Sequence, residues 1–113
     1  DSVASRGLGD VYKRQIPIVF DFHHHDIHPD GLSEQQALAL ACKTWQVRPC
    51  THYSESRQIE DPKCRLKRAH STLVYSQIQD YGMDFDCVVE AKGKELAIFH
   101  HRRKWQNAPE LIA

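Results

Sequence analysis

Histidine and carboxylate side chains cluster in one short stretch of this 113-residue chain, between positions 21 and 28. Asp21 is followed by three consecutive histidines, His23 to His25, and Asp26 and His28 come directly after them. Imidazole and carboxylate groups are ligands for divalent transition metals, and histidine also transfers protons near neutral pH. The chain has eight histidines in all, which is a high number for its length. The stretch therefore indicates either a metal or acid–base site or a surface cluster of histidines.

An apolar segment precedes the cluster and must position it. Residues 16–20 read Ile-Pro-Ile-Val-Phe, a run of β-branched and aromatic side chains that is typical of a strand buried on both faces. In proteins with parallel sheets, the reactive groups lie beyond the carboxyl ends of the strands. A buried strand that ends in carboxylate and imidazole groups predicts one wall of a metal site, and we favour this interpretation over a surface cluster.

Two further strands are predicted, and a potential ligand lies at the end of each. Residues 50–53 form a short strand that contains His52, and residues 85–91 form a third strand that ends at Glu90. His70 lies in the long polar loop between these two strands. The carboxyl ends of parallel strands meet at one edge of a sheet. We therefore expect five side chains to meet at this edge: Asp21, His24, His52, His70 and Glu90.

Helices are predicted between and after these strands. Ser33 and Gln36 form a capping box, and apolar residues at helical spacing continue the pattern over residues 34–45. A last helix is predicted over residues 94–103, with Leu96, Ala97 and Phe99 or His100 facing inward, and a short helix over residues 73–81. The tail after residue 107 is predicted to be frayed. A strand, helix and strand in this order form a βαβ unit with parallel strands, so the predicted fold class is α/β.

Composition excludes several classes of protein. Fifteen basic and fifteen acidic residues give a formal charge of zero, so any contact with nucleic acid must rely on a local basic group. Arg65, Lys67 and Arg68 in the polar loop are the candidates for phosphate contacts, and a solvated basic loop is the alternative. No apolar run reaches the roughly 18 residues of a membrane span. The four cysteines lack the spacing of a zinc knuckle, and we expect them to be reduced, in a cytoplasmic protein.

Four short segments of the chain carry a resemblance to one family. They are Asp21-Phe22-His23-His24-His25, His52-Tyr53-Ser54-Glu55-Ser56, Arg68-Ala69-His70-Ser71 and Val88-Val89-Glu90-Ala91-Lys92-Gly93-Lys94-Glu95. Together they span about residues 16–103, and they resemble segments of the UV-damage DNA endonucleases that occur in the same order. The resemblance implies the C-terminal part, about three βα units, of a TIM-type (β/α)8 barrel, and an enzyme that uses divalent metal ions to nick DNA beside photoproducts.

The resemblance also implies how the metal ligands are shared. Asp21, His52 and Glu90 would hold one ion, with Glu90 as a bridging ligand, and His24 and His70 would hold another. Manganese is the expected metal, with zinc or magnesium as alternatives. The sequence departs from some family members at Cys50, where they have a lysine that can serve the metal site in modified form. The neighbours expected to orient ligands through hydrogen bonds are His23, His25 and Lys92.

We expect residues 16–113 to be the C-terminal portion of such a barrel, and the segment before them differs in character. Residues 5–15 resemble a translated sequencing adapter, so we expect residues 1–15 to be a non-native arm. A complete barrel of this type has roughly 250 residues, so the chain would be a fragment that is inactive alone. Ile18, Phe20 and Val89 would face the barrel interior and lose their partners. The full-length enzyme would be a monomer that acts on damaged double-stranded DNA. Another metal-dependent barrel enzyme, such as an abasic-site endonuclease or a sugar isomerase, and an inert fragment are the alternatives.

Overall fold

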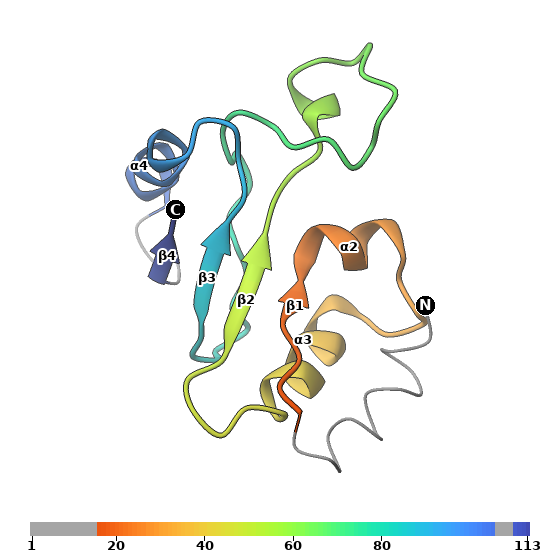
Figure 1. Ribbon diagram of the computed structural model, residues 1–113, viewed down its shortest axis with the longest axis vertical. Helices are drawn as coiled ribbons and strands as arrows, with labels where there is room; N and C mark the ends of the chain where they lie inside the picture. Colours follow the sequence, from red (N-terminus) through yellow and green to blue (C-terminus); the bar gives the residue numbers. More distant parts are fainter. Residues whose placement is uncertain (1–15, 106–109) are drawn as a thin grey trace.

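The computed structural model describes residues 16–105 and 110–113, so the predicted non-native arm lies outside the described residues. Within them, four strands form one parallel sheet in the order β1-β2-β3-β4. In Figure 1 the arrows of the strands point to the same end of the sheet. The parallel α/β arrangement predicted from the sequence is confirmed. The strands are β1 (Phe20–Asp21), β2 (Cys50–Tyr53), β3 (Asp86–Val89) and β4 (Glu110–Ile112).

The fourth strand corrects the prediction of a frayed tail. Glu110–Ile112 pairs in parallel with β3, and Leu111 lies opposite Cys87. Leu111 is buried, so this short strand closes one side of the core. The sequence signal is weak because three residues are too few to show an alternating pattern.

A helix replaces the extended end that was expected for the first strand. β1 has only two residues, and Phe22–Ile27 forms α2 directly after it. Asp21 is the N-cap of α2, because its Oδ1 accepts a hydrogen bond of 3.0 Å from the backbone N–H of His24. His24 therefore lies in the first turn of a helix and not at the end of a strand. Aspartate is among the preferred N-cap residues, and this explains why the chain turns here.

Two longer helices flank the sheet. α3 (Glu34–Cys42) begins with the predicted capping box of Ser33 and Gln36. It ends three residues earlier than expected, and the hydroxyl of Thr44 donates to the carbonyl of Ala41 at 2.6 Å. α4 (Glu95–Lys104) lies beside β4 (Figure 1). In the described part of the chain, no helix is long and apolar enough to cross a membrane.

The inward face of α4 differs from the prediction. Ala97, Ile98 and His101 are buried, whereas Leu96 is 63% exposed and Phe99 is 52% exposed. Apolar residues occur on both sides of this helix, so the pattern alone did not identify the side that packs. The imidazole of His101, which was not among the predicted inward residues, takes a core position.

Residues 73–81 do not form the predicted helix. Their backbone donors are taken by two glutamates of the preceding loop: Glu60 accepts from Leu73 at 3.0 Å, and Glu55 accepts from Tyr75 at 2.8 Å. These hydrogen bonds hold the segment against the loop, and Val74 and Ile78 are buried in the core without helical structure. The connection from β2 to β3 therefore contains only one short 3-10 helix, η2 (Arg57–Ile59), among the described elements.

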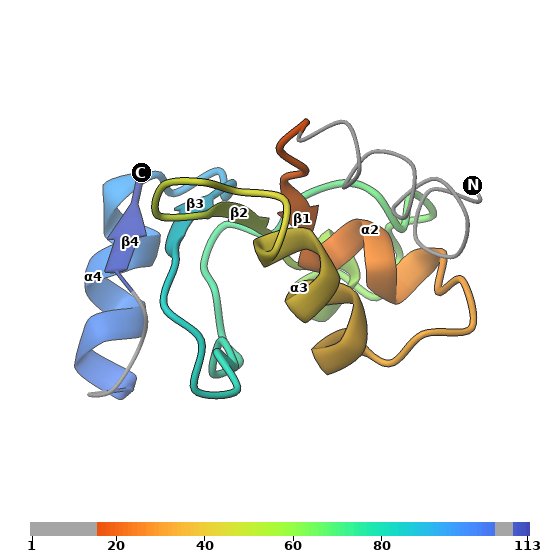
Figure 2. The same cartoon turned by 90° about the horizontal axis from the view of Figure 1, so that it is seen from below.

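The two faces of the sheet are unlike each other. Phe20, Thr51, Cys87 and Leu111 lie side by side in register and are all buried. Figure 2 shows α3 on one side of the sheet and no helix over the other side in the described part. Side chains of the intervening positions point to this open face, because neighbouring residues of a strand alternate. The open-face positions of the central register are Asp21, His52, Val88 and Ile112.

This arrangement corrects the expectation for the interior of the barrel. Phe20 and Val89 are buried on the helix side, and Ile18 packs against the same core. Ile112 of β4 is 45% exposed, and Val19, which precedes β1, is 44% exposed. Neighbouring residues of a strand face opposite sides of the sheet, so the expected and observed faces differ by one position along the strand. A continuous apolar run could not indicate which of its side chains faces the helices.

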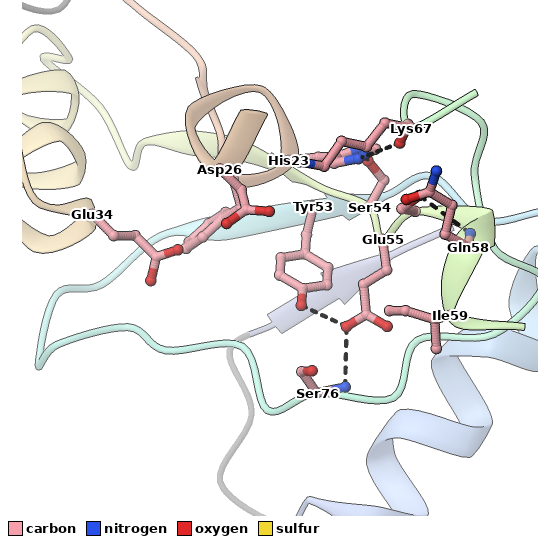
Figure 3. A pocket seen from close by; sticks show the side chains of 12 residues that line it. His23, Asp26, Glu34, Tyr53, Ser54, Glu55, Gln58, Ile59, Lys67 and Ser76 are labelled. Atoms are coloured by element: carbon pink, nitrogen blue, oxygen red, sulfur yellow. Dashed lines mark hydrogen bonds between the residues drawn. The ribbon is translucent and has the colours of Figure 1, made fainter. Parts of the chain in front are cut away.

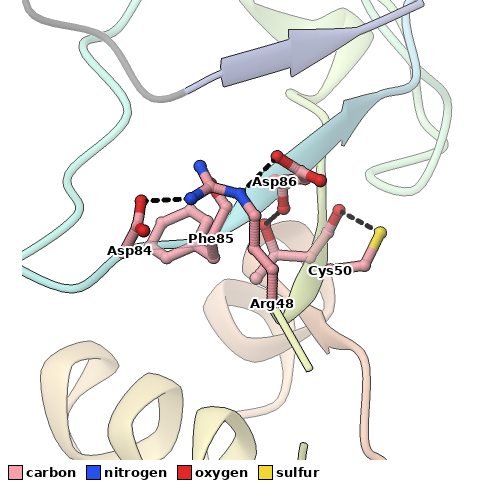
Figure 4. Close-up of polar contacts among 6 residues, drawn as sticks. Arg48, Cys50, Asp84, Phe85 and Asp86 are labelled. Carbon is pink, nitrogen blue, oxygen red and sulfur yellow. Dashed lines mark hydrogen bonds and ion pairs between the residues drawn. The ribbon is translucent and has the colours of Figure 1, made fainter. Parts of the chain in front are cut away.

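An ion cluster fixes the register of β2 and β3 at the end away from the histidines. Arg48 bridges Asp84 at 2.5 Å and Asp86 at 2.7 Å, and it also donates to the carbonyl of Phe85 at 3.1 Å (Figure 4). These hydrogen bonds with the two carboxylates raise the pKa of the Arg48 guanidinium. The cluster joins Arg48, just before β2, to Asp86 at the start of β3. It therefore supports the parallel register of β2 and β3 that brings His52 beside Val88.

Candidate metal centre

Three of the five predicted ligands meet at the carboxyl ends of neighbouring strands. Asp21 and His52 are register partners on β1 and β2, and Glu90 directly follows β3. Each offers one ligand atom, and these three atoms lie within 4.8 Å of one another. The distance from His52 Nδ1 to Glu90 Oε1 is 3.4 Å. The group is open to solvent, since the side chains of His52 and Glu90 are 39% and 43% exposed.

The donor set of these three residues fits a divalent metal ion. Two carboxylates and one imidazole are ligands that suit manganese or zinc, and their bonds to the metal are about 2.0–2.2 Å long. Ligands at that distance lie roughly 3 Å apart in a closed site, so the observed separations need only small side-chain rotations. The capping bond of Asp21 uses Oδ1, and a carboxylate has further lone pairs for a cation.

His24 and His70 lie beside this group but not within it. They line a recess of about 150 Å³ together with Asp21 and Arg68. His70 is held in place by the loop, since Ser56 and His70 form an isolated antiparallel bridge. His24 is exposed, and its ring lies 5.3 Å from the ring of His28. Asp21 therefore lies next to both sets of residues that the family resemblance assigns to separate ions.

His23 has a different position from its neighbours, because it is buried and both ring nitrogens are engaged. Nδ1 lies 3.0 Å from the hydroxyl of Ser54, and Nε2 lies 3.1 Å from the carbonyl of Lys67. A carbonyl only accepts, so Nε2 carries the proton. His23 thus joins α2 to the end of β2 and to the basic loop, which fits an orienting residue and leaves no nitrogen for a metal.

The other two expected orienting residues occupy separate environments. His25 is half-buried, and its ring lies 5.5 Å from the ring of Phe20. Lys92 is exposed and lines a larger recess of about 600 Å³ on the Glu90 side of the site. Neither residue forms a hydrogen bond to the ligand group within the described part of the chain.

Of the three loop cations proposed for phosphate contacts, one lies beside the candidate ligands Asp21, His24 and His70. Arg68 lines both the small recess and the larger one, so it stands between them. Lys67 instead lines a cavity under α2, and Arg65 is exposed and lines none of these hollows. The sequence could not predict which of these three cations lies beside the candidate ligands, because the loop has no regular secondary structure.

A further cavity of about 430 Å³ lies under α2 (Figure 3). Its acidic lining residues are Asp26, Glu34 and Glu55, and none of them was among the predicted ligands. Glu55 is buried there and accepts hydrogen bonds from the Tyr53 hydroxyl at 2.6 Å and from the backbone of Tyr75 and Ser76. Burial and the bond to Glu55 raise the pKa of Tyr53, so its hydroxyl stays protonated. Glu55 thus has a structural role. It lies two residues after Tyr53, the last residue of β2, and no sequence pattern indicated its burial.

Comparisons with known proteins give one consistent family. The sequence profile of the UV-endonuclease UvdE family matches residues 8–111. The UV-damage endonuclease of Schizosaccharomyces pombe (strain 972) is 35% identical over 104 residues, which are 83% of this chain and 17% of that protein. The UV DNA damage endonuclease of Nostoc sp. (strain PCC 7120) is 35% identical over 101 residues, which are 82% of this chain and 30% of that protein.

A solved structure agrees with the sequence comparisons. The crystal structure of SacUVDE superposes with a TM-score of 0.66 at 28% sequence identity, and the match covers 88% of this chain and 34% of that chain. The chain therefore spans about a third or less of the length of these relatives.

Proposed function

Because the chain belongs to the UV-endonuclease UvdE family, we propose that it supplies part of the metal centre of an enzyme that nicks DNA beside ultraviolet photoproducts. Its parallel sheet, with α3 on one face, matches SacUVDE and is part of an α/β barrel of the TIM type. In such barrels the active site lies at the carboxyl ends of the strands. This is the end at which the ligand atoms of Asp21, His52 and Glu90 converge, and that convergence carries the proposal.

The proposed roles follow from the chemistry of the three groups. A bound divalent ion would supply Lewis-acid stabilisation of the charge that develops on the cleaved phosphate. Asp21 and Glu90 provide negative charge that attracts the cation, and His52 provides a nitrogen that favours manganese or zinc over magnesium. Manganese is our proposed metal. His24 and His70, in the recess next to Asp21, are proposed to contribute to a second ion.

Damaged double-stranded DNA is the proposed partner. Arg68 stands between the two recesses, and we propose that it binds a backbone phosphate close to the metal centre. Contacts of this kind set the position of the duplex and carry no sequence information, as a repair enzyme that meets lesions in any sequence requires. A lesion that unstacks easily costs less free energy to extrude, and this favours damaged over intact sites.

A chimera tests the proposal, since this chain matches only a segment of each relative. Residues 16–113 would replace the matched segment of the Nostoc enzyme, and nicking of ultraviolet-irradiated plasmid would be measured with and without Mn²⁺. We expect Mn²⁺-dependent nicking of irradiated plasmid in preference to undamaged plasmid. His52→Ala and Glu90→Ala should each reduce the rate by at least tenfold. Lys43→Ala, at an exposed position after α3, is the matched control and should have no effect.

Two outcomes would contradict the proposal. A folded chimera that cuts plasmid containing abasic sites, and not irradiated plasmid, would favour the abasic-site endonuclease. A folded chimera whose activity is unchanged in His52→Ala and Glu90→Ala would show that these residues hold no essential metal. Circular dichroism of each variant establishes that a loss of activity is not a loss of structure.

A further inference from the structure

The larger recess beside Glu90 is lined by several cationic side chains. Its volume is about 600 Å³, and its walls include Arg68 and His70 from the loop and Lys92 and Lys94 from the turn after β3. We propose that Lys92 and Lys94 form, with Arg68, a binding site for a backbone phosphate of the DNA. This inference rests on the proposed function, and it adds two substrate-contacting residues to it.

The charges of the recess favour an anion. Arg68, Lys92 and Lys94 are exposed, and their side chains form no ion pair or hydrogen bond within the described part of the chain. Glu90 is the acidic side chain of the lining, and its carboxylate belongs to the ligand group on the other side. The terminal residue Ala113 also lines the recess, so its carboxylate offsets part of the positive charge of the three cations. The chain as a whole has a formal charge of zero, so this excess of positive charge is local. Unpaired cations that surround a hollow concentrate negatively charged ligands there.

The two walls of the recess are joined by backbone hydrogen bonds. The N–H of Lys92 donates to Ser71 at 2.9 Å, and the N–H of Gly93 donates to Thr72, also at 2.9 Å. A Cβ at Gly93 would lie 2.6 Å from the carbonyl oxygen of Thr72, so this position requires glycine. The turn and the loop therefore hold their cationic side chains at a fixed separation, as a phosphate site requires.

Lys94 occupies a backbone conformation that lysine rarely adopts. Its φ is 54° and its ψ is −127°, and no side-chain hydrogen bond compensates at this start of α4. Glycine would adopt the same angles without strain. Non-glycine residues in such conformations cluster at functional sites, where the side chain is needed despite its cost in stability. The strained position of Lys94 lies on the recess, and so we assign its side chain a role in binding.

A DNA-binding assay on the chain tests the proposal. Fluorescence anisotropy of a short labelled duplex would be measured between about 50 and 200 mM salt, since each phosphate contact adds about 0.9 to the slope of log K against log salt. Lys92→Gln and Lys94→Gln should each weaken binding and reduce that slope by about this amount. The matched control is Arg102→Gln with Arg103→Gln, which removes two exposed cations from the other end of α4. The control should leave the slope unchanged.

A glycine variant separates binding from folding. Lys94→Gly relieves the backbone strain and removes the cation, so the melting temperature should rise by several degrees while DNA binding weakens as in Lys94→Gln. Weaker binding cannot then be ascribed to a damaged fold. A Lys94→Gly variant that binds duplex as tightly as the unchanged chain would overturn the proposal.

Further outcomes distinguish this inference from the proposed function. If Lys92→Gln and Lys94→Gln behave like the control pair, or if the unchanged chain binds no duplex, the phosphate site is wrong. Titration with Mn²⁺, followed by electron paramagnetic resonance, tests the metal centre in the same samples. A chain that binds duplex through these lysines but binds no Mn²⁺ would support the recess and contradict the metal centre.

Discussion

Asp21 has two separable duties at the scale of single residues. Its Oδ1 caps α2, and its carboxylate also belongs to the candidate ligand group. Asparagine caps helices about as well as aspartate, whereas alanine does not. Asn and Ala at this position therefore distinguish a structural aspartate from a metal ligand.

The first prediction compares these two variants in a thermal unfolding experiment. Without metal, Asp21→Asn should keep nearly all of the chain's stability, and Asp21→Ala should lose about 1 kcal/mol through the missing cap. With excess Mn²⁺, the unchanged chain should gain stability, because a ligand that binds only the folded state stabilises it. Both variants should gain much less. An equal gain in Asp21→Asn and the unchanged chain would show that Asp21 is a cap and not a ligand.

The second prediction concerns Glu60, which holds the segment after the basic loop. Burial disfavours its charged form, but hydrogen bonds from the Tyr75 hydroxyl at 2.5 Å and from the backbone of Thr72 and Leu73 outweigh this and lower the pKa of Glu60 to about 2. The pKa is lower in the folded state than the ordinary value of 4.5. The stabilisation is therefore complete above about pH 4.5 and is lost as the pH falls toward about 2.

Glu60→Gln checks this prediction. Since Glu60 is largely exposed, solvent screens the interaction, and we expect a loss of about 1 kcal/mol at neutral pH in urea unfolding. The difference between the variant and the unchanged chain should shrink as the pH falls below about 4.5. A difference that stays constant down to about pH 2.5 would mean that the charge of Glu60 contributes nothing.

At this scale, the sequence predicted that three candidate ligands lie close together, but it did not predict the roles of their neighbours. Asp21, His52 and Glu90 were predicted to meet at one rim, and their ligand atoms do lie together. His23 could not be told from His24 and His25, because three adjacent histidines carry no pattern that indicates which one is buried. The side of α2 that packs against the core determines which histidine is buried. The sequence analysis did not predict this helix, because it did not recognise Asp21 as an N-cap.

At the scale of elements, prediction succeeded where local chemistry determines structure. The capping box at Ser33 sets the start of α3, and the apolar runs of β2 and β3 identify buried strands. Prediction failed where a segment's structure involves contacts with residues outside that segment. Residues 73–81 are irregular, and their backbone is held by hydrogen bonds to Glu55 and Glu60 of the preceding loop. The helix propensity of a segment depends on its own residues, so it does not reveal contacts with acceptors elsewhere in the chain.

The docking of α4 gives the third prediction. His101 is fully buried, its Nε2 lies 3.2 Å from the carbonyl of Ser76, and its Nδ1 has no partner among the described residues. Burial lowers the pKa of His101, although the bond to Ser76 opposes this. The unfolded chain therefore binds a proton more readily than the folded chain, and stability should fall as the pH drops below about 6.5.

His101→Gln removes the titrating group and keeps a donor for the carbonyl of Ser76. We expect the unfolding free energy of the unchanged chain to fall more steeply than that of the variant between about pH 7 and pH 5. The exposed His28 supplies the matched control, and His28→Gln should follow the unchanged chain. Parallel pH profiles for His101→Gln and the unchanged chain would show that burial of this imidazole has no effect on stability.

The whole molecule presents an incomplete barrel surface. β1 and β4 are the outer strands of the sheet, so each has one edge without a paired strand in the described part. The open face carries the ligand group together with apolar side chains such as Ile112, which is 45% exposed. Unpaired edges and uncovered apolar faces promote association with other chains.

The fourth prediction is that residues 16–113, expressed alone, associate and do not nick DNA. Association would bury apolar side chains of the open face, and each Val or Ile that becomes buried contributes about 1.5–3 kcal/mol, a large share of the stability of a small domain. Catalysis should fail for a separate reason. Asp21, His52 and Glu90 supply three ligands on a solvent-exposed site, and an ion held by them alone would bind weakly.

Light scattering and a plasmid assay test the two parts independently. The scattering mass should exceed that of one chain at micromolar concentration, and Mn²⁺ should produce no nicking of irradiated plasmid. Adding a charge to the open face by Ile112→Lys should reduce association without restoring activity, because it blocks apolar contact and supplies no ligand. A monomer that cuts irradiated DNA in preference to undamaged DNA would show instead that these strands form a working site on their own.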